Sequence, residues 1–182
     1  MASIWLLLIA TCVYMLLDHS YQPAQTNASV AAWPTNSRLS RNSSGIQLVM
    51  FAHPCCPCTA ASLNELDRLV REIPDGTIAT IAFNIRGLSA EDLAHADNLK
   101  LLKDSEKLTL FYDDGSEADA FGATVSGELL AFDCSGRRLF RGGLTAARGH
   151  AGESVGRDVL QQIAGGQFLD ACETPVYGCR LP

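Results

Sequence analysis

The stretch Phe51–Thr59 constrains the fold of this chain more than any other, because it places three cysteines and two prolines within nine residues. An apolar run, residues 46–50, precedes it. In residues 59–73 the apolar side chains recur every three or four positions, as on one face of a helix. The sequence therefore predicts a strand that leads into a Cys-x-Pro-Cys turn at the start of a helix.

Such a turn suits thiol–disulfide chemistry. Backbone N–H groups at the start of a helix favour negative charge and lower the pKa of a nearby thiol. We expect Cys55 to be the exposed thiolate that attacks, and Cys58, one turn later, to be the resolving thiol. Pro57 restricts the backbone between them, which helps to hold two sulfurs within bonding reach.

Half of a structural zinc site is the alternative explanation for three neighbouring cysteines. A zinc ribbon needs a second pair of ligands at a suitable distance, and Cys172 and Cys179 lie far away with the wrong spacing. A strand–Cys-x-Pro-Cys–helix context is more specific than an isolated Cys-x-x-Cys pair. We therefore favour a redox site over a structural metal site.

Two neighbours of the pair, and the two tail cysteines, each allow more than one interpretation. Cys56 is either a small exposed side chain that the turn tolerates or a third thiol that exchanges with the others. His53 is either a solvent-facing residue at the strand end, an imidazolium that stabilises a thiolate, or a metal ligand. The tail pair Cys172 and Cys179 forms either a structural disulfide or a second redox pair that relays electrons to the Cys55/Cys58 site.

The charge and the cysteine content of the chain limit which partners and which cellular compartment are expected. The chain has 182 residues with a net charge of −6, from 14 basic and 20 acidic side chains, so nucleic acid is not an expected partner. Four arginines near the second hairpin strand are expected to be solvated. Seven cysteines favour an oxidising compartment, and we expect the domain to face the periplasm or the cell exterior.

The amino-acid composition changes along the chain and divides it into four segments. Residues 1–17 are uncharged and mostly apolar, which predicts an N-terminal transmembrane anchor or a signal segment, and we favour an uncleaved anchor. Residues 18–45, rich in Ser, Asn, Ala, Thr and Pro, predict a flexible linker. A domain over 46–165 and a tail over 166–182 complete the chain.

The domain is expected to alternate strands and helices as β-α-β-α-β-β-α, with Pro74-Asp75-Gly76 as a turn and a capping box at the start of the second helix. This order predicts an α/β fold with a central mixed sheet flanked by helices. The expected elements after the first helix are strands 77–85 and 108–112, helices 89–106, 116–121 and 153–163, and a hairpin of 128–133 and 137–141 around Cys134.

Over residues 45–165 the chain resembles the thioredoxin superfamily. The resemblance rests on Leu48–Phe51 ahead of the cysteine stretch and on the hairpin. Residues 142–150 and 174–179 are similar to a bacterial group of RedB-like proteins, which are thioredoxin-like and membrane-tethered. This resemblance implies a thioredoxin-like fold and places the loop that carries Arg148 and His150 beside the redox turn. Either side chain is then expected to favour a thiolate or to lie in a solvated loop.

The chain departs from the thioredoxin pattern at three positions. No proline occurs between Pro74 and Pro175, so one of the residues 125–127 takes the place of the family's cis-proline. Met50 replaces a buried aspartate, and Pro54 replaces the tryptophan before the first cysteine. These changes affect partner binding and proton handling, whereas exchange itself needs only two sulfurs and no cofactor.

The sequence thus predicts a membrane-tethered thiol–disulfide oxidoreductase that acts on protein thiols and disulfides. The alternative is a thioredoxin-fold metallochaperone that binds Cu(I) through Cys55 and Cys58, with Cys56 or His53 as further ligands, because soft thiolates select Cu(I). A non-catalytic thioredoxin-like module that binds partners is a third possibility.

Overall fold

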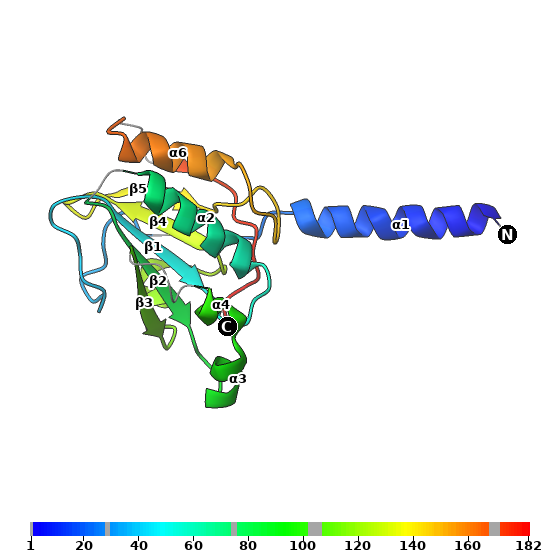
Figure 1. The fold of residues 1–182 in the computed structure, drawn as a ribbon, viewed down its shortest axis with the longest axis horizontal. Helices are drawn as coiled ribbons and strands as arrows, with labels where there is room; N and C mark the ends of the chain where they lie inside the picture. Colours follow the sequence, from blue (N-terminus) through cyan, green and yellow to red (C-terminus); the bar gives the residue numbers. More distant parts are fainter. Residues whose placement is uncertain (1, 28–29, 74–75, 102–106, 168–171) are drawn as a thin grey trace.

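The computed structural model describes residues 2–27, 30–73, 76–101, 107–167 and 172–182. Its helices and strands follow the chain in the order shown in Figure 1. They are α1 (Ala2–Tyr21), β1 (Gln47–Ala52), α2 (Thr59–Glu72), β2 (Ile78–Asn84), α3 (Ala90–His95), α4 (Asp97–Lys100), β3 (Leu108–Asp113), α5 (Ser116–Phe121), β4 (Glu128–Phe132), β5 (Arg138–Gly142), α6 (Val155–Ala164) and β6 (Cys172–Glu173).

The strands form one sheet in the order β3-β2-β1-β4-β5-β6. Strands β1, β2 and β3 run parallel, whereas β4 is antiparallel to both β1 and β5. The predicted central mixed sheet flanked by helices is therefore confirmed. The short strand β6, which pairs with β5 in parallel, was not expected.

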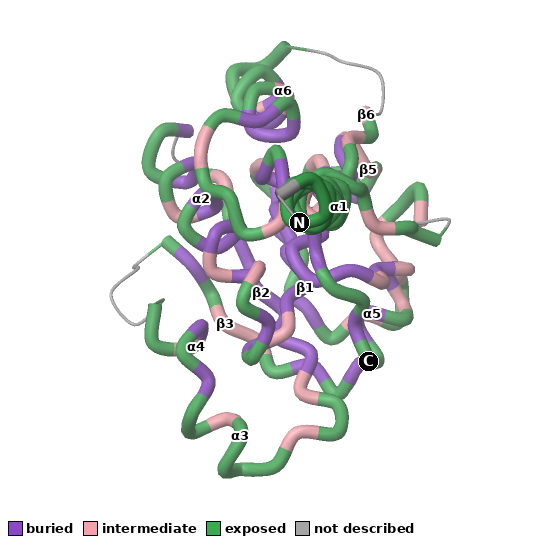
Figure 2. Tube along the Cα trace, turned by 90° about the vertical axis from the view of Figure 1, so that its right-hand side faces the viewer, coloured by how far each residue is buried: buried purple, intermediate pink, exposed green. Residues whose placement is uncertain are grey.

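Strand β1 lies at the centre of the sheet, and all six of its residues are buried. Its alternate side chains divide the core: Leu48 and Met50 face a cluster that includes the apolar side of α2 and α6, whereas Val49 and Phe51 face a second cluster on the other side. Figure 2 shows this buried centre beneath exposed helix surfaces.

The second face of the sheet is covered partly by α5 and partly by the segment that the sequence predicts as a flexible linker. The Trp33 ring lies edge-on to Phe121 and Phe132, with centroid distances of 5.0 and 5.2 Å. Leu39 is 7% exposed in the same cluster. Residues 30–42 thus contact the domain instead of running free in solvent. Isolated apolar residues in a polar segment give no periodic signal, so the sequence pattern did not reveal this contact.

Helix α1 is the predicted apolar N-terminal helix, and it extends to Tyr21, beyond the expected 1–17. Its span Ser3–Tyr21 has a mean hydropathy of 1.5 and is long and apolar enough to cross a membrane. None of that span is buried, and Figure 1 shows α1 projecting away from the domain. By length and composition it fits either a membrane anchor or a signal sequence.

The predicted helix 89–106 is two short helices in the part that the structure describes. Ala96, with φ −72° and ψ 102°, is extended and separates α3 from α4. The expected capping box at Ser89 is present, with Asp92 as its second member. Residues 102–106 lie outside the described residues, as do 74–75 of the predicted turn.

One of the arginines expected to be solvated is buried. Arg141 of β5 is 5% exposed and contacts Glu128 of β4 at 2.6 Å. The second carboxylate oxygen of Glu128 accepts the backbone N–H of Thr124 at 3.0 Å and of Val125 at 3.3 Å. This buried ion pair therefore fixes the loop that precedes β4.

Replacing Trp33 by alanine is expected to lower the free energy of unfolding by about 2–3 kcal/mol, because it removes a large ring from two aromatic contacts. Urea unfolding followed by circular dichroism measures the change. Tyr112→Ala is the matched control, since Tyr112 is 52% exposed on the edge strand β3, and should cost under about 1 kcal/mol. Equal, small effects of both changes would show that residues 30–42 behave as a free linker.

Candidate thiol site

The site lies beyond the carboxyl ends of β1 and β2, where parallel α/β sheets commonly bind their ligands. Residues 53–58, here called the cysteine turn, connect β1 to α2. Cys58 occupies the N-cap position of α2, as the predicted strand–turn–helix order requires. The backbone N–H groups at this helix start point toward the turn and favour negative charge there.

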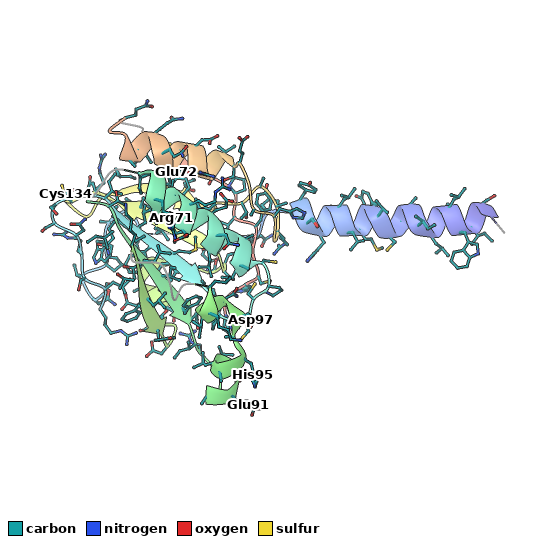
Figure 3. All side chains as sticks on the ribbon, in the orientation of Figure 1. Arg71, Glu72, Glu91, His95, Asp97 and Cys134 are labelled. Atoms are coloured by element: carbon teal, nitrogen blue, oxygen red, sulfur yellow. The ribbon has the colours of Figure 1, made fainter. Side chains whose placement is uncertain are left out.

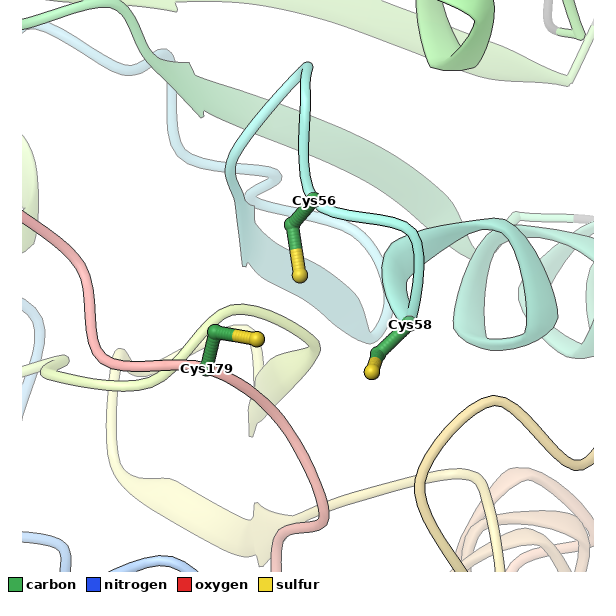
Figure 4. Close-up of side chains that lie close together, drawn as sticks. All are labelled: Cys56, Cys58 and Cys179. Atoms are coloured by element: carbon green, nitrogen blue, oxygen red, sulfur yellow. The ribbon is translucent and has the colours of Figure 1, made fainter.

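Three cysteines converge at this point. The sulfurs of Cys56, Cys58 and Cys179 all lie within 4.8 Å of one another. Figure 4 shows that they come from the cysteine turn, the start of α2 and the C-terminal tail, and that their side chains point toward a common centre. Cys56 is buried, Cys58 is partly buried and Cys179 is exposed. The cluster therefore joins segments more than a hundred residues apart.

The tail reaches the cluster because it pairs with the loop before β4. The Ser126 N–H donates to the Cys179 carbonyl, and the Leu181 N–H donates to the Thr124 carbonyl, each at 2.8 Å. Val125 and Arg180 form an antiparallel bridge between these two hydrogen bonds. The backbone around Cys179 is thus held in an extended, strand-like position beside the cysteine turn.

Gly178 permits this close approach. A Cβ atom at this position would overlap the carbonyl oxygen of Ser126. Arg148 then fixes the same residue, because its guanidinium donates to the Gly178 carbonyl. The Arg148 side chain also donates to the His19 carbonyl at 3.1 Å, at the end of α1. Arg148 therefore connects the tail to the N-terminal helix beside the site.

Cys56 carries the most acidic thiol of the cluster. Burial raises the pKa of its thiol, but hydrogen bonds from the Cys179 thiol, the Thr59 hydroxyl and the backbone N–H groups of Cys58 and Thr59 outweigh burial, so the pKa falls below its ordinary value. Hydrogen bonding to the charged form is the physical cause, because it stabilises the thiolate. Cys56 is thus the favoured thiolate of the three.

The other two thiols remain protonated more readily. Burial raises the pKa of Cys58, as does negative charge on Cys56, while the positive charge of Arg148 opposes this shift. Burial raises the pKa of Cys179 to about 12, together with hydrogen bonding to Cys56 and the charges of Cys56 and Cys58. One thiolate flanked by two thiols is the arrangement that these pKa values favour.

Cys55, the predicted attacking thiol, is exposed and is not a member of the cluster. Its sulfur lies 3.9 Å from the Asp92 carbonyl oxygen, beside α3. Partial burial and the negative charge of Asp92 raise the pKa of the Cys55 thiol. Local spacing identified the turn, but not which of two adjacent cysteines faces the sheet end.

The surroundings of His53 disfavour the imidazolium form. Burial lowers its pKa, which favours the neutral ring. Its Nδ1 atom accepts the backbone N–H of Cys55 at 3.3 Å, so it shapes the cysteine turn. His150 is exposed, and its ring contacts the Arg148 carbonyl at 2.8 Å instead of the cluster. Of the two loop residues, the structure brings Arg148 to the site.

Cys172, the predicted partner of Cys179, lies elsewhere. It is opposite Phe140 on β6 and packs against the core cluster under α2 and α6. Cys134 is exposed in the hairpin turn, at the end of the domain opposite His95 and Asp97 in Figure 3. The structure therefore separates the two tail cysteines and brings only Cys179 to the cysteine turn.

Three polar residues around the turn were not predicted as site residues. The Ser126 hydroxyl accepts the His53 N–H at 2.8 Å and lies 2.6 Å from the Thr59 hydroxyl. The Asn98 side-chain amide donates to the Cys56 carbonyl at 2.8 Å. The sequence indicated Ser126 only as one of the residues at the cis-proline position. Asn98 thus holds the Cys56 carbonyl, and Ser126 holds the two ends of the turn at His53 and Thr59.

A groove gives access to the turn. It has a volume of about 300 Å³ and is lined on one side by residues 54–57 and Ala60, and on the other by residues 95–98. Cys56 lines the groove although only 5% of its surface is exposed. Neither Cys58 nor Cys179 is among the lining residues.

Alkylation rates should separate Cys56 from Cys55. The alkylation rate of a cysteine rises with pH as its thiol ionises, and its midpoint is the pKa of that thiol. Because the pKa of Cys56 is lowered from the ordinary value of 9.0 and that of Cys55 is raised from it, the midpoint should lie below pH 9 for Cys56 and above pH 9 for Cys55. Iodoacetamide labelling of the full-length protein in detergent, read residue by residue by mass spectrometry between about pH 6 and 11, measures both midpoints. The midpoint is compared instead of the rate, since Cys56 is less accessible. A lower midpoint for Cys55 would contradict the assignment.

No protein-family model matches the chain, and no curated protein matches it. Among solved structures, a hypothetical protein from Sinorhizobium meliloti 1021 is similar with a TM-score of 0.66 at 17% identity, over 86% of this chain and 96% of that one. An uncharacterized conserved protein from Geobacillus kaustophilus is similar with a TM-score of 0.62 at 18% identity, over 89% of this chain and 93% of that one. A thioredoxin-like protein from Aeropyrum pernix matches with a TM-score of 0.48 at 15% identity, over 74% of this chain and 89% of that one.

The first two similarities show a shared fold. The strand order with β1 at its centre, the antiparallel β4–β5 hairpin and the cysteine turn at the start of α2 make this fold thioredoxin-like, as the sequence predicts.

Proposed function

We propose that this protein is a membrane-tethered thiol–disulfide oxidoreductase that acts on the thiols and disulfides of partner proteins. The observation that carries the proposal is the convergence of three cysteine sulfurs at the start of α2 in a thioredoxin-like fold. We assign the attacking thiol to Cys56, in place of Cys55, and its redox partner to one of the other two cysteines of the cluster, Cys58 or Cys179. The similarity of residues 174–179 to RedB-like proteins includes Cys179, and we include membership of that group in the proposal.

The reaction begins with the Cys56 thiolate. It attacks one sulfur of a partner disulfide, forms a Cys56–partner mixed disulfide and releases the other partner sulfur as a thiolate. A second thiol of the cluster then attacks Cys56, forms an internal disulfide and releases the partner in its reduced form. The reverse sequence oxidises a partner dithiol. Each direction transfers two electrons between sulfur pairs and requires no cofactor.

The surroundings of Cys56 fit this role. Hydrogen bonds lower the pKa of its thiol, and the groove between the cysteine turn and α4 is lined in part by Cys56. Asn98 and Ser126 hold the turn, so little reorganisation is needed when the sulfur reacts. Helix α1 would anchor the domain, and the seven cysteines favour an outward-facing location in an oxidising compartment.

Cu(I) binding is the second candidate function, and the three-sulfur cluster favours it. Soft thiolates select Cu(I). Metal–sulfur bonds of about 2.3 Å in a trigonal site place the sulfurs about 4 Å apart, so the cluster would contract by less than about 1 Å. In this case Cys56, Cys58 and Cys179 would be the ligands, and Cys55 and His53 would not.

Catalysed exchange between glutathione and a self-quenched fluorescent peptide disulfide tests the first candidate with the full-length protein in detergent. Cys56→Ser should lower the rate constant by about 100-fold, because it removes the attacking sulfur. Cys55→Ser should change it by less than about threefold. Cys134→Ser, at the distant hairpin turn, is the matched control and should leave it unchanged.

Two outcomes would overturn parts of this proposal. Loss of activity in Cys55→Ser with retention in Cys56→Ser would return the attacking role to Cys55. No catalysed exchange by the wild-type protein, together with one equivalent of Cu(I) that protects all three cluster thiols from alkylation, would leave the metallochaperone.

A further inference from the structure

Two thiols lie near Cys56, and either would complete the reaction by attacking the mixed disulfide. Cys58 is the neighbour expected from the sequence motif. Cys179 comes from the tail, which pairs with residues 124–126 and buries Leu181 in the core.

We propose that Cys179 is the resolving cysteine of the site, and that the oxidised protein contains a Cys56–Cys179 disulfide that joins the tail to the cysteine turn. This assignment rests on the proposed thiol–disulfide exchange function and names the residue that completes it. The tail then acts as a fixed strand that presents one thiol to Cys56.

The backbone on both sides suits this bond. Hydrogen bonds of Ser126 and Leu181 hold the tail on either side of Arg180, and the Arg148 guanidinium holds the Gly178 carbonyl. Cys179 therefore faces Cys56 from a positioned strand and is separate from the turn itself. Sulfurs within 4.8 Å reach the bonding distance of about 2.05 Å by side-chain rotation and a small shift of the tail.

Closure between Cys56 and Cys58 is more restricted. Only Pro57 separates the two residues, and its ring fixes the backbone φ angle between them. Cys58 is in the αR conformation, with φ −70° and ψ −23°, at the N-cap of α2. The Cys56 carbonyl is held by Asn98 and by the Thr59 N–H, at 2.8 and 3.1 Å. A bond between these two sulfurs must therefore move a turn that several hydrogen bonds fix.

The groove leaves both candidate resolving thiols clear of the partner, because neither Cys58 nor Cys179 lines it. A partner that reaches Cys56 through the groove arrives on the side lined by residues 54–57 and 95–98. Cys179 is not among the residues that line this groove, so it meets Cys56 from another side. Thiol–disulfide exchange needs the attacking and leaving sulfurs on different sides of the central sulfur, and this placement leaves the partner free to depart.

The chemical step balances with sulfur groups alone. The Cys179 thiol loses its proton to solvent, and its sulfur attacks Cys56 in the Cys56–partner mixed disulfide. The Cys56–partner bond breaks, the Cys56–Cys179 bond forms, and the partner leaves as a thiolate that takes up a proton. The partner disulfide has gained two electrons, and Cys56 and Cys179 have lost them.

Glutathione disulfide is the probe for this step. The reduced full-length protein in detergent is mixed with it, quenched in acid at successive times and digested with trypsin without reduction. The sequence places all three cysteines of the turn in peptide 42–68 and Cys179 in peptide 158–180. Wild-type protein should give these two peptides linked, with the Cys56–Cys179 bond located by fragmentation, and little glutathione adduct.

Variants distinguish the two candidate resolving thiols. Cys179→Ser should increase the lifetime of the Cys56–glutathione adduct by about tenfold or more, since it removes the attacking sulfur. Cys58→Ser should still form the linked peptides. Cys172→Ser, which removes the other cysteine of peptide 158–180, is the matched control and should behave like the wild type.

Each outcome either supports or overturns the assignment. Rapid loss of the adduct in Cys179→Ser, with a persistent adduct in Cys58→Ser, would make Cys58 the resolving thiol and overturn the proposal while leaving the exchange function in place. No Cys56 adduct and no disulfide in any variant would instead overturn the exchange function itself.

Discussion

The pairing of the C-terminal tail with residues 124–126 is the interaction on which the candidate site depends. Two backbone hydrogen bonds and one antiparallel bridge hold the tail there. The loop that receives it is itself fixed by the buried Glu128–Arg141 ion pair, which is costly to break because it would leave an uncompensated charge. A chain of contacts from the interior of the sheet thus determines where Cys179 lies.

That placement changes the chemistry of the cysteine turn. With Cys179 beside it, Cys56 receives a hydrogen bond from a second thiol and becomes the favoured thiolate. Three sulfurs in one cluster suit both exchange through an internal disulfide and capture of a soft metal ion. In the exchange reaction two of the sulfurs form a bond with each other, whereas in metal binding the sulfurs share one ion. The same three residues therefore serve both proposals.

Local features of this fold were predictable from the sequence, whereas long-range ones were not. Strand β1 and helix α2 follow from an apolar run and a helical period, because each pattern depends on neighbouring residues. The contact of Trp33 with the sheet, the burial of Arg141 and the arrival of Cys179 depend on segments distant in sequence. The proposed exchange of roles between Cys55 and Cys56 has a similar cause, because the turn is held by Asn98 at the Cys56 carbonyl and by Ser126 at the His53 N–H, and both residues are distant from the turn in sequence.

The most direct test of the Cys56–Cys179 couple is an equilibrium redox titration of the full-length protein in detergent, in glutathione buffers of graded potential. After acid quenching, differential alkylation and mass spectrometry report the reduced fraction of every cysteine. If Cys56 and Cys179 form the redox couple, they lose their reactivity together, over the same range of potential. Continued alkylation of Cys179 while Cys55 and Cys58 become protected together would contradict it.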